Sequence, residues 1–342
     1  MSKRSESSGA GRATLRRTAL VCGGLLLLLA VVLIVASVIG SQRLPLAASL
    51  CALTGRSSCG LSSEQQAILF DIRLPRILLA GAVGTCLASA GAGYQALLRN
   101  PLAEPYLLGV SNGAAVGTMT ALVFFGVHEW SRPVMAFAGA LAATFVVYRL
   151  ARGRAGATPE RLILAGVIVT TFLSSGIVFI TTMMDATRIR SFTFWLLGDL
   201  SGTTTSLLTV ALVAAAIGVI ILALNARSLN LMMLGERDAF DLGVEVSRVR
   251  VTVFVAASLL VGASVASSGS VGYVGLVVPH LVRLSFGSDN RLVIIASALA
   301  GAAFVIVADT IARSIIAPRE LPVGAITALI GAPLFIYLLR RG

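Results

Sequence analysis

Apolar residues come in long uninterrupted runs along almost the whole chain, and short segments with Pro, Gly and charged residues separate them. A helix of about 20 apolar residues is long enough to cross a hydrocarbon layer of ~30 Å. Because the runs are continuous rather than alternating, they predict membrane-spanning helices and not the strands of a barrel. We therefore predict an all-α polytopic membrane protein.

The polar breaks divide the chain into ten candidate spans. The first apolar run is longer than the core of a cleaved signal peptide, which has about 7–15 residues, so we expect a retained span. The eighth run is short enough for a half-helix or a tilted segment. A basic tail (1–17) precedes a single transmembrane domain (18–342). The predicted spans are residues 18–40, 74–96, 107–127, 133–150, 161–183, 203–225, 249–267, 272–285, 292–315 and 322–339.

Composition agrees with this class. Charged residues make up 12% of the chain, against about 25% in soluble domains, and the mean hydropathy is +0.93. The formal charge of +12 does not indicate nucleic-acid binding, because the basic residues stand at the ends of the apolar runs. Of the Lys and Arg residues, eighteen fall on the side of the N-terminus and nine on the other side. This bias predicts that both termini are cytoplasmic.

Enzymatic chemistry is not indicated. A P-loop needs a lysine for the phosphates, and the only lysine is Lys3 in the basic tail. The histidines, His128 and His280, are far apart and form no zinc-protease motif, and we expect His280 to be a cap or packing residue. We assign no catalytic residue and no metal site.

An ion-driven carrier is also disfavoured. Asp309 is the only acidic residue at mid-membrane depth, and Arg313 follows one helical turn later on the same face. Such a pair is typical of a structural contact, whereas proton carriers place several acidic residues within the membrane. The ion-driven alternative predicts gradient-driven uptake into liposomes that contain this chain alone.

The four cysteines do not show metal-site spacing. Cys22 and Cys86 lie in apolar runs, where we expect them to be small packing residues. Cys51 and Cys59 share one loop that we place outside the cytoplasm. They form either a disulfide or two free thiols.

Two segments resemble each other: ASAGAGYQALLRNP (residues 88–101) and ASSGSVGYVGLVVP (residues 266–279). The first ends a span that runs inward and the second a span that runs outward, as expected for the inverted repeats of transporters. Similar composition of Gly- and Ser-rich helices explains the likeness equally well.

The segment LMMLGERDAFDLGVEVSR (residues 231–248) interrupts this apolar chain with charge. Four of the fifteen acidic residues fall within ten positions there: Glu236, Asp238, Asp241 and Glu245. The predicted topology places the segment in the cytoplasm, between the sixth and seventh spans.

Three further motifs have a characteristic order: IRLPR (72–76), RNPLAEP followed by LGVSNGA (99–114), and ELPVGAITALIGAP (320–333). Together with the acidic segment, they closely resemble the FecCD permease family, the membrane subunits of ABC importers for iron–siderophore complexes, haem and cobalamin. The resemblance extends from about Ile72 to the C-terminus. It implies a type II ABC importer permease with ten helices in each of two subunits, as a homodimer or a heterodimer.

The resemblance also implies the partners. These are two ATPase subunits, which use ATP and Mg²⁺, an extracytoplasmic substrate-binding protein and the lipid bilayer. No cofactor is expected on this chain itself, and no nucleic acid.

Family roles transfer to matching positions only. The segment 229–247 resembles coupling helices, implied to be two short helices that contact the ATPase subunit. Outer-face arginines are implied to dock the binding protein, although helix-end anchoring is an alternative for them. A third set is implied to form a cytoplasmic gate, although turn and helix-cap chemistry also explains it. The implied coupling residues are Leu234, Gly235, Glu236, Asp238, Asp241 and Gly243. The implied docking arginines are Arg73, Arg76, Arg313 and Arg319, and the implied gate residues are Asn100, Leu102, Thr158 and Pro159.

These observations predict a non-catalytic permease subunit in a bacterial inner membrane. The first expectation for its cargo is an iron–siderophore, with cobalamin or haem as alternatives within the same family.

Overall fold

The computed structural model describes residues 3–40, 42, 44–54, 59–124, 130–153, 156–317 and 319–341. His128 lies outside these described residues. Within them the chain is helical apart from two paired antiparallel strands of two residues each, β1 (Arg152–Gly153) and β2 (Gly156–Ala157). Seven helices are long and apolar enough to cross a membrane, and three shorter apolar helices complete the ten predicted spans.

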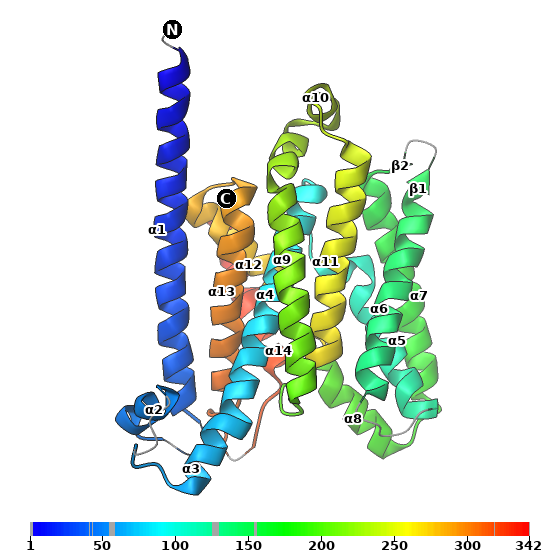
Figure 1. The fold of residues 1–342 in the computed structure, drawn as a ribbon. Helices are drawn as coiled ribbons and strands as arrows, with labels where there is room; N and C mark the ends of the chain where they lie inside the picture. Colours follow the sequence, from blue (N-terminus) through cyan, green and yellow to red (C-terminus); the bar gives the residue numbers. More distant parts are fainter. Residues whose placement is uncertain are drawn as a thin grey trace.

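The helices form one bundle (Figure 1). The long helices are α1 (Lys3–Val38), α4 (Leu74–Leu97), α6 (Ser131–Ala151), α7 (Pro159–Thr181), α9 (Thr205–Leu234), α11 (Val246–Ser268) and α13 (Asn290–Ala312). The shorter spans are α5 (Val110–Phe124), α12 (Val274–Phe286) and α14 (Val323–Arg341). The connecting elements are α2 (Leu46–Leu53), α3 (Ser63–Ala67), the π-helical turn η1 (Ile68–Arg73), the 3₁₀ turn η2 (Pro105–Leu108), α8 (Ala186–Leu196) and α10 (Glu236–Asp241).

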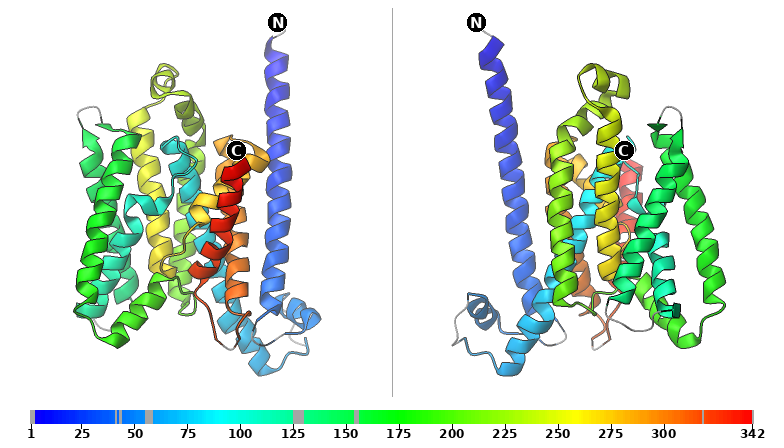
Figure 2. Two further views of the ribbon diagram at one scale, coloured as in Figure 1. Left: turned by 180° about the vertical axis from the view of Figure 1, so that it is seen from behind. Right: turned by 45° about the vertical axis from the view of Figure 1, so that its right-hand side comes forward.

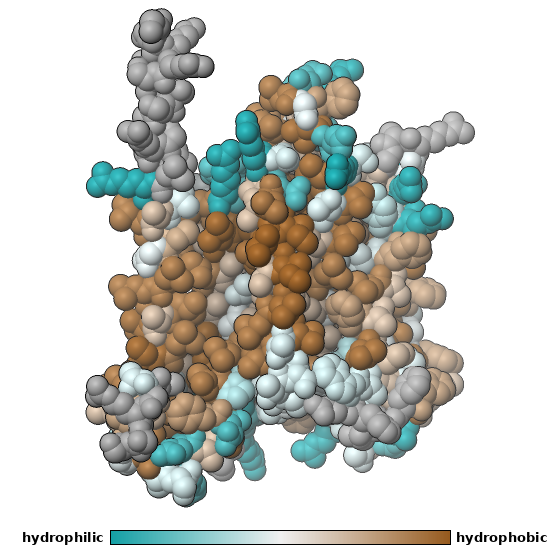
Figure 3. Space-filling model, in the orientation of Figure 1, coloured by the Kyte–Doolittle hydropathy of each residue, from teal (hydrophilic) through white to brown (hydrophobic). Residues whose placement is uncertain are grey.

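Both termini lie at the same end of the bundle, together with α10 and the β1–β2 hairpin, while α2, α3 and α8 lie at the opposite end (Figures 1 and 2). The space-filling view shows an apolar belt between two polar ends (Figure 3). This distribution is the one that a bilayer requires of a spanning protein.

Helix α4 forms the centre of the bundle. It is buried along nearly its whole length and packs against α13, α11, α9 and α12. Small residues permit this close packing: a Cβ atom on Gly84 would lie 2.1 Å from the carbonyl oxygen of Gly301 in α13. In lipid, such close backbone contact supplies the dispersion attraction that holds helices together.

Two spans are interrupted inside the bundle. The short η2 turn precedes α5 and ends at Gly109, whose φ is +77°. An irregular segment, residues 269–273, precedes α12, and both Gly269 (+69°) and Tyr273 (+67°) have positive φ. The expectation of a short eighth helix is confirmed, and the third span is shortened in the same way.

The sixth span extends beyond its predicted end. Helix α9 continues from residue 225 to Leu234 because Ala226, Leu229 and Met232 keep a buried face at helical spacing. At the other terminus of the chain, α1 begins at Lys3, so the basic tail and the first span share one helical backbone.

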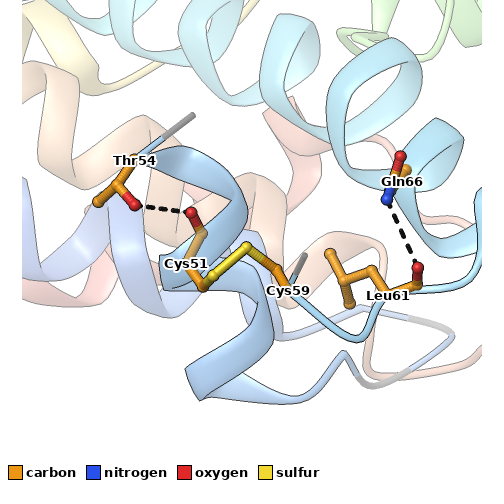
Figure 4. Close-up of a disulfide and its surroundings, with 5 residues drawn as sticks. All are labelled: Cys51, Thr54, Cys59, Leu61 and Gln66. Carbon is orange, nitrogen blue, oxygen red and sulfur yellow. Dashed lines mark hydrogen bonds between the residues drawn. A yellow bond between two sulfur atoms is a disulfide. The ribbon is translucent and has the colours of Figure 1, made fainter. Parts of the chain in front are cut away.

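Cys51 of α2 and Cys59 form a disulfide, which decides the alternative that the sequence left open (Figure 4). Their Cα atoms are 5.5 Å apart, and Thr54 donates a hydrogen bond to the Cys51 carbonyl at the end of α2. Cys22 and Cys86 remain free thiols, and Cys86 is buried as expected of a packing residue.

The two similar segments of the sequence lie against each other. A Cβ atom on Gly91 would lie only 1.9 Å from the carbonyl oxygen of Gly275. Pro279 cannot donate an N–H to that carbonyl, which lies four residues earlier in α12. The Gln95 side chain of α4 donates to it instead, at 3.3 Å, and to Leu276 O at 3.1 Å.

This contact predicts that substitution by alanine lowers stability far more at Gly91 than at Gly93. Gly91→Ala forces two backbones apart, which should cost about 1–3 kcal/mol or more of stability. Gly93→Ala meets only the end of the Leu222 side chain, at 3.1 Å, and gains helix propensity, so it should change stability by no more than about 1 kcal/mol. Thermal unfolding of both variants in detergent measures the difference. Equal effects would contradict the close α4–α12 contact.

Candidate functional site

The acidic segment forms a protrusion at the end of the bundle that carries both termini. It comprises the end of α9, the short helix α10 and the turn that leads into α11 (Figure 1). Gly235 (φ +143°) and Gly243 (φ +83°) permit the sharp turns on either side of α10. The expectation of two short helices is wrong here, because the first of them is the continuation of α9.

Apolar side chains dominate the tip of the protrusion. Leu234 is 70% exposed, Phe240 70% and Leu242 62%, although all three stand beyond the apolar belt. Large apolar patches that water would otherwise cover are typical of interaction sites. Sequence reasoning missed Phe240 and Leu242, and the available signal was their position among acidic residues outside any span.

The acidic residues of the protrusion differ in their surroundings. Asp238 and Asp241 are exposed. Glu236 instead forms an ion pair with Arg250, a buried residue of α11. Glu236 therefore holds α10 against the bundle, and its carboxylate is already paired within the chain.

The predicted gate residues lie at two helix ends. The Leu102 N–H donates to Asn100 Oδ1 at 2.9 Å, which closes the turn after α4, and Leu102 itself is exposed. Thr158 is the N-cap position of α7 and Pro159 its first residue, as the alternative interpretation expected, but the Thr158 side chain accepts no cap hydrogen bond. Glu160, at the start of α7, interacts electrostatically with Arg99 and Arg250. The start of α7 therefore lies near Arg99 of the turn after α4.

Three of the four outer-face arginines are buried at the opposite end of the bundle. Arg76 Nη2 lies 2.9 Å from Asp309 Oδ1, and Arg76 Nη1 lies 2.7 Å from Glu320 Oε2. Arg313 lies 3.7 Å from the same Asp309, which confirms the expected structural pair and adds Arg76 to it. Arg73 donates to the carbonyl groups of Ser37 and Val38 at the end of α1.

These arginines surround a small cavity of about 160 Å³, whose wall includes Arg73, Arg76, Arg313 and Glu320. Arg313, which follows the end of α13, faces the Asp309 carboxylate, and a guanidinium group keeps its charge at neutral pH. With three guanidinium groups against the carboxylates of Asp309 and Glu320, the cavity carries excess positive charge. Arg319 is exposed and takes no part in this wall.

Among the described residues, the structure contains no group of three or more His, Cys, Asp or Glu side chains that could hold a metal ion. His280 packs edge-on against the ring of Phe335 at 6.1 Å, in agreement with a packing role.

The segment FWLLGDLSG (residues 194–202) lies at the same end as the arginines. Its backbone pairs with two other elements: Asp199 N–H donates to Ser268 O at 2.8 Å, and Gly324 N–H donates to Leu197 O at 3.0 Å. The segment thus connects the end of α11 with the start of α14.

Taken together, the structure shows a ten-span bundle with an apolar-tipped protrusion at one end and a partly open cationic cavity at the other. Comparison with known proteins defines the class of this membrane protein. The chain belongs to the FecCD transport family, whose model matches residues 26–341. It is a permease subunit of an ABC importer, a transport protein and not an enzyme.

Relatives and a solved structure agree with this assignment. The chain is 42% identical over 300 residues to the cobalamin import permease BtuC of Halobacterium salinarum, covering 88% of this chain and 80% of that protein. It is 40% identical to the hemin transport permease HmuU of Yersinia pestis, covering 80% and 83% respectively. A putative metal-chelate type ABC transporter, solved in an inward-facing conformation, superposes with a TM-score of 0.82 at 32% identity, covering 95% of this chain and all of that one.

Proposed function

We propose that this permease imports cobalamin, which an extracytoplasmic binding protein delivers, and that haem is the second candidate. The observation that carries the proposal is the similarity to proteins whose names state cobalamin and hemin transport. Among the named relatives, a vitamin B12 permease of Vibrio cholerae is also 42% identical over 82% of this chain. These relatives favour the alternative cargo of the sequence analysis over an iron–siderophore.

The proposed assembly contains two permease subunits and two ATPase subunits in a bacterial cell membrane. ATP and Mg²⁺ act in the ATPase subunits, since this chain has no lysine beyond Lys3 with which to build a P-loop. Both termini and α10 face the cytoplasm. The excess of arginine on that side and the Cys51–Cys59 disulfide at the opposite end both support this orientation.

The protrusion around α10 is the proposed contact with the ATPase subunit. Phe240, Leu242 and Leu234 supply an apolar centre, while Asp238 and Asp241 supply a charged rim. Buried aromatic anchors with a polar rim provide most of the affinity at protein interfaces. Gly235 and Gly243 set the angle of α10 on the bundle.

The arginine cavity is the proposed docking point for an acidic side chain of the binding protein. At the edge of the cavity, the Glu320 side chain, which is about half exposed, forms an ion pair with Arg76 Nη1. An incoming carboxylate can replace Glu320 there, because the cavity retains excess positive charge. Arg319 adds an exposed cation on the same face, which steers an acidic partner.

The turn at Asn100 and Leu102, with Thr158 and Pro159 at the start of α7, is the proposed cytoplasmic gate. Arg99 of the turn and Glu160 of α7 carry opposite charges and lie near enough to attract each other, which places the two segments at the same end of the bundle.

Reconstitution tests the function and its cargo. Proteoliposomes with the permease, its ATPase subunits and its binding protein should accumulate labelled cobalamin when ATP is present inside them. Haem and a ferric siderophore serve as competing cargoes under the same conditions. Uptake that requires only this chain and an ion gradient would overturn the proposal, and ATP-driven uptake of a siderophore alone would overturn the cargo.

Phe240→Ala should weaken binding of the ATPase subunit by about tenfold or more, because a central aromatic anchor contributes on the order of 2 kcal/mol. Asp238→Lys should weaken this binding by a smaller factor than Phe240→Ala, and the loss of affinity should be larger at low salt than at high salt. Phe172→Ala, at a residue 76% exposed on α7, is the matched control and should leave binding unchanged. Affinity of the purified subunits in detergent measures all three. Unchanged binding of Phe240→Ala would place the contact elsewhere.

Glu320→Ala should strengthen binding of the binding protein by about threefold to fivefold, since it frees a guanidinium N–H of Arg76 for the partner. Asp71→Ala removes an equal charge from an exposed residue of η1 outside the cavity wall and is the control. Arg319→Glu should weaken binding, most strongly at low salt. If Glu320→Ala and Asp71→Ala act alike, long-range charge rather than the cavity governs docking.

A further inference from the structure

The break before α12 is held by side chains from the segment that follows the gate turn. The Tyr106 hydroxyl donates to Val271 O and accepts from Val271 N–H, each at 2.9 Å. Glu104 Oε1 accepts the Tyr273 N–H at 3.1 Å. These backbone groups lie outside any helix and have no water in the apolar interior, so side chains supply their hydrogen-bond partners.

The same contacts stabilise an uncommon backbone conformation. Tyr273 has a φ of +67°, a left-handed conformation that large side chains rarely adopt. Its N–H is directed at Glu104, and Pro105 lies close enough that a Cβ on Gly275 would be 2.9 Å from the proline ring. A fourth hydrogen bond joins the hydroxyl groups of Ser111 and Ser270 at 3.2 Å.

On its other side, the break is joined to the outer end of the bundle. Asp199 N–H donates to Ser268 O, and a Cβ on Gly269 would lie 1.9 Å from the carbonyl oxygen of Trp195. The end of α8 and the residues after it therefore pack directly against the start of the break.

The holding segment is equally joined to the gate turn. Asn100 N–H donates to Gln95 O and Ala103 N–H donates to Asn100 O, both at 3.1 Å. Only one residue separates Leu102 from Glu104. The chain itself joins the gate turn to residues 104–106, hydrogen bonds join these residues to the break, and a further hydrogen bond joins Ser268, just before the break, to Asp199 after α8. This series of covalent and hydrogen bonds connects the gate turn with the outer end of the bundle.

We propose that Glu104 and Tyr106 are positioning residues that make the gate turn (residues 98–103) and the break (residues 269–273) move as one unit during transport. This inference rests on the proposed importer function. The groups that they bind are backbone N–H and C=O groups without helical partners. A displacement of either segment must carry the other with it or leave those groups unpaired.

Two pairs of variants separate this role from simple packing. Tyr106→Phe removes the hydroxyl that binds Val271, whereas Tyr94→Phe removes another hydroxyl, which contacts Ser258 at 2.5 Å and lies outside the series. Glu104→Leu removes the acceptor for Tyr273 N–H, whereas Glu104→Gln retains an oxygen at the same position. The two variants of each pair are matched in side-chain size.

The measurements are cobalamin transported per ATP hydrolysed in the reconstituted complex, and amide hydrogen exchange of the full chain. Tyr106→Phe and Glu104→Leu should lower cargo per ATP by about fivefold or more while ATP hydrolysis continues. Glu104→Gln should restore most of the ratio, and Tyr94→Phe should match the wild type. Exchange should rise in both residues 98–103 and residues 269–276 for the two disruptive variants only.

Distinct outcomes identify which idea fails. Wild-type complexes without ATP-driven uptake of any offered cargo would reject the proposed function, and hydrogen exchange would still test the linkage. If Tyr106→Phe matches Tyr94→Phe in cargo per ATP, or if exchange rises in the break without rising in the gate turn, the linkage is rejected. Glu104 and Tyr106 would then only pack the bundle.

Discussion

The rest of this structure depends on one constraint: inside an apolar bundle, every backbone N–H and C=O needs a partner. Continuous helices satisfy this by themselves, but the chain breaks its helices before α5 and α12 and places a proline within α12. Side chains from neighbouring segments supply the missing partners, chiefly Gln95 at Gly275 and Tyr106 at Val271. Hydrogen bonds from neighbouring elements therefore fix the conformation of the irregular segments.

The distribution of charge follows the same physical logic. Charged side chains are costly in lipid unless paired, and Asp309, which is buried in the last turn of α13, is bound by Arg76 and Arg313. The exposed charges stand at the two polar ends of the apolar belt (Figure 3). Where apolar side chains leave the belt, at Phe240 and Leu242, water would otherwise cover them, and a protein partner is the natural occupant.

Much of the fold could be predicted from sequence because membrane spans are local signals. The ten spans, the short eighth helix and the Asp309–Arg313 pair follow from run length and helical spacing. The predicted end of a helix was wrong where the helix continues beyond its apolar run. Helix α9, for example, extends to Leu234 because its last turns keep a buried apolar face. The candidate site was predicted less completely. Glu236 and the arginines were expected to face partners, but Glu236, Arg73, Arg76 and Arg313 form ion pairs or hydrogen bonds to carbonyl groups within the chain.

The sequence by itself determined the class of protein, the number of spans and the family, since each is encoded in apolar runs and ordered motifs along the chain. Only the tertiary structure decided which polar groups are paired. Arg76 with Asp309 across 233 positions and Glu104 with Tyr273 across 169 are contacts between segments distant in sequence. Cys51 and Cys59 are neighbours in one loop, yet only the folded loop shows that their thiols are joined. The physical reason is that residue spacing describes one helix at a time, whereas the partner of a buried polar group is set by how helices pack.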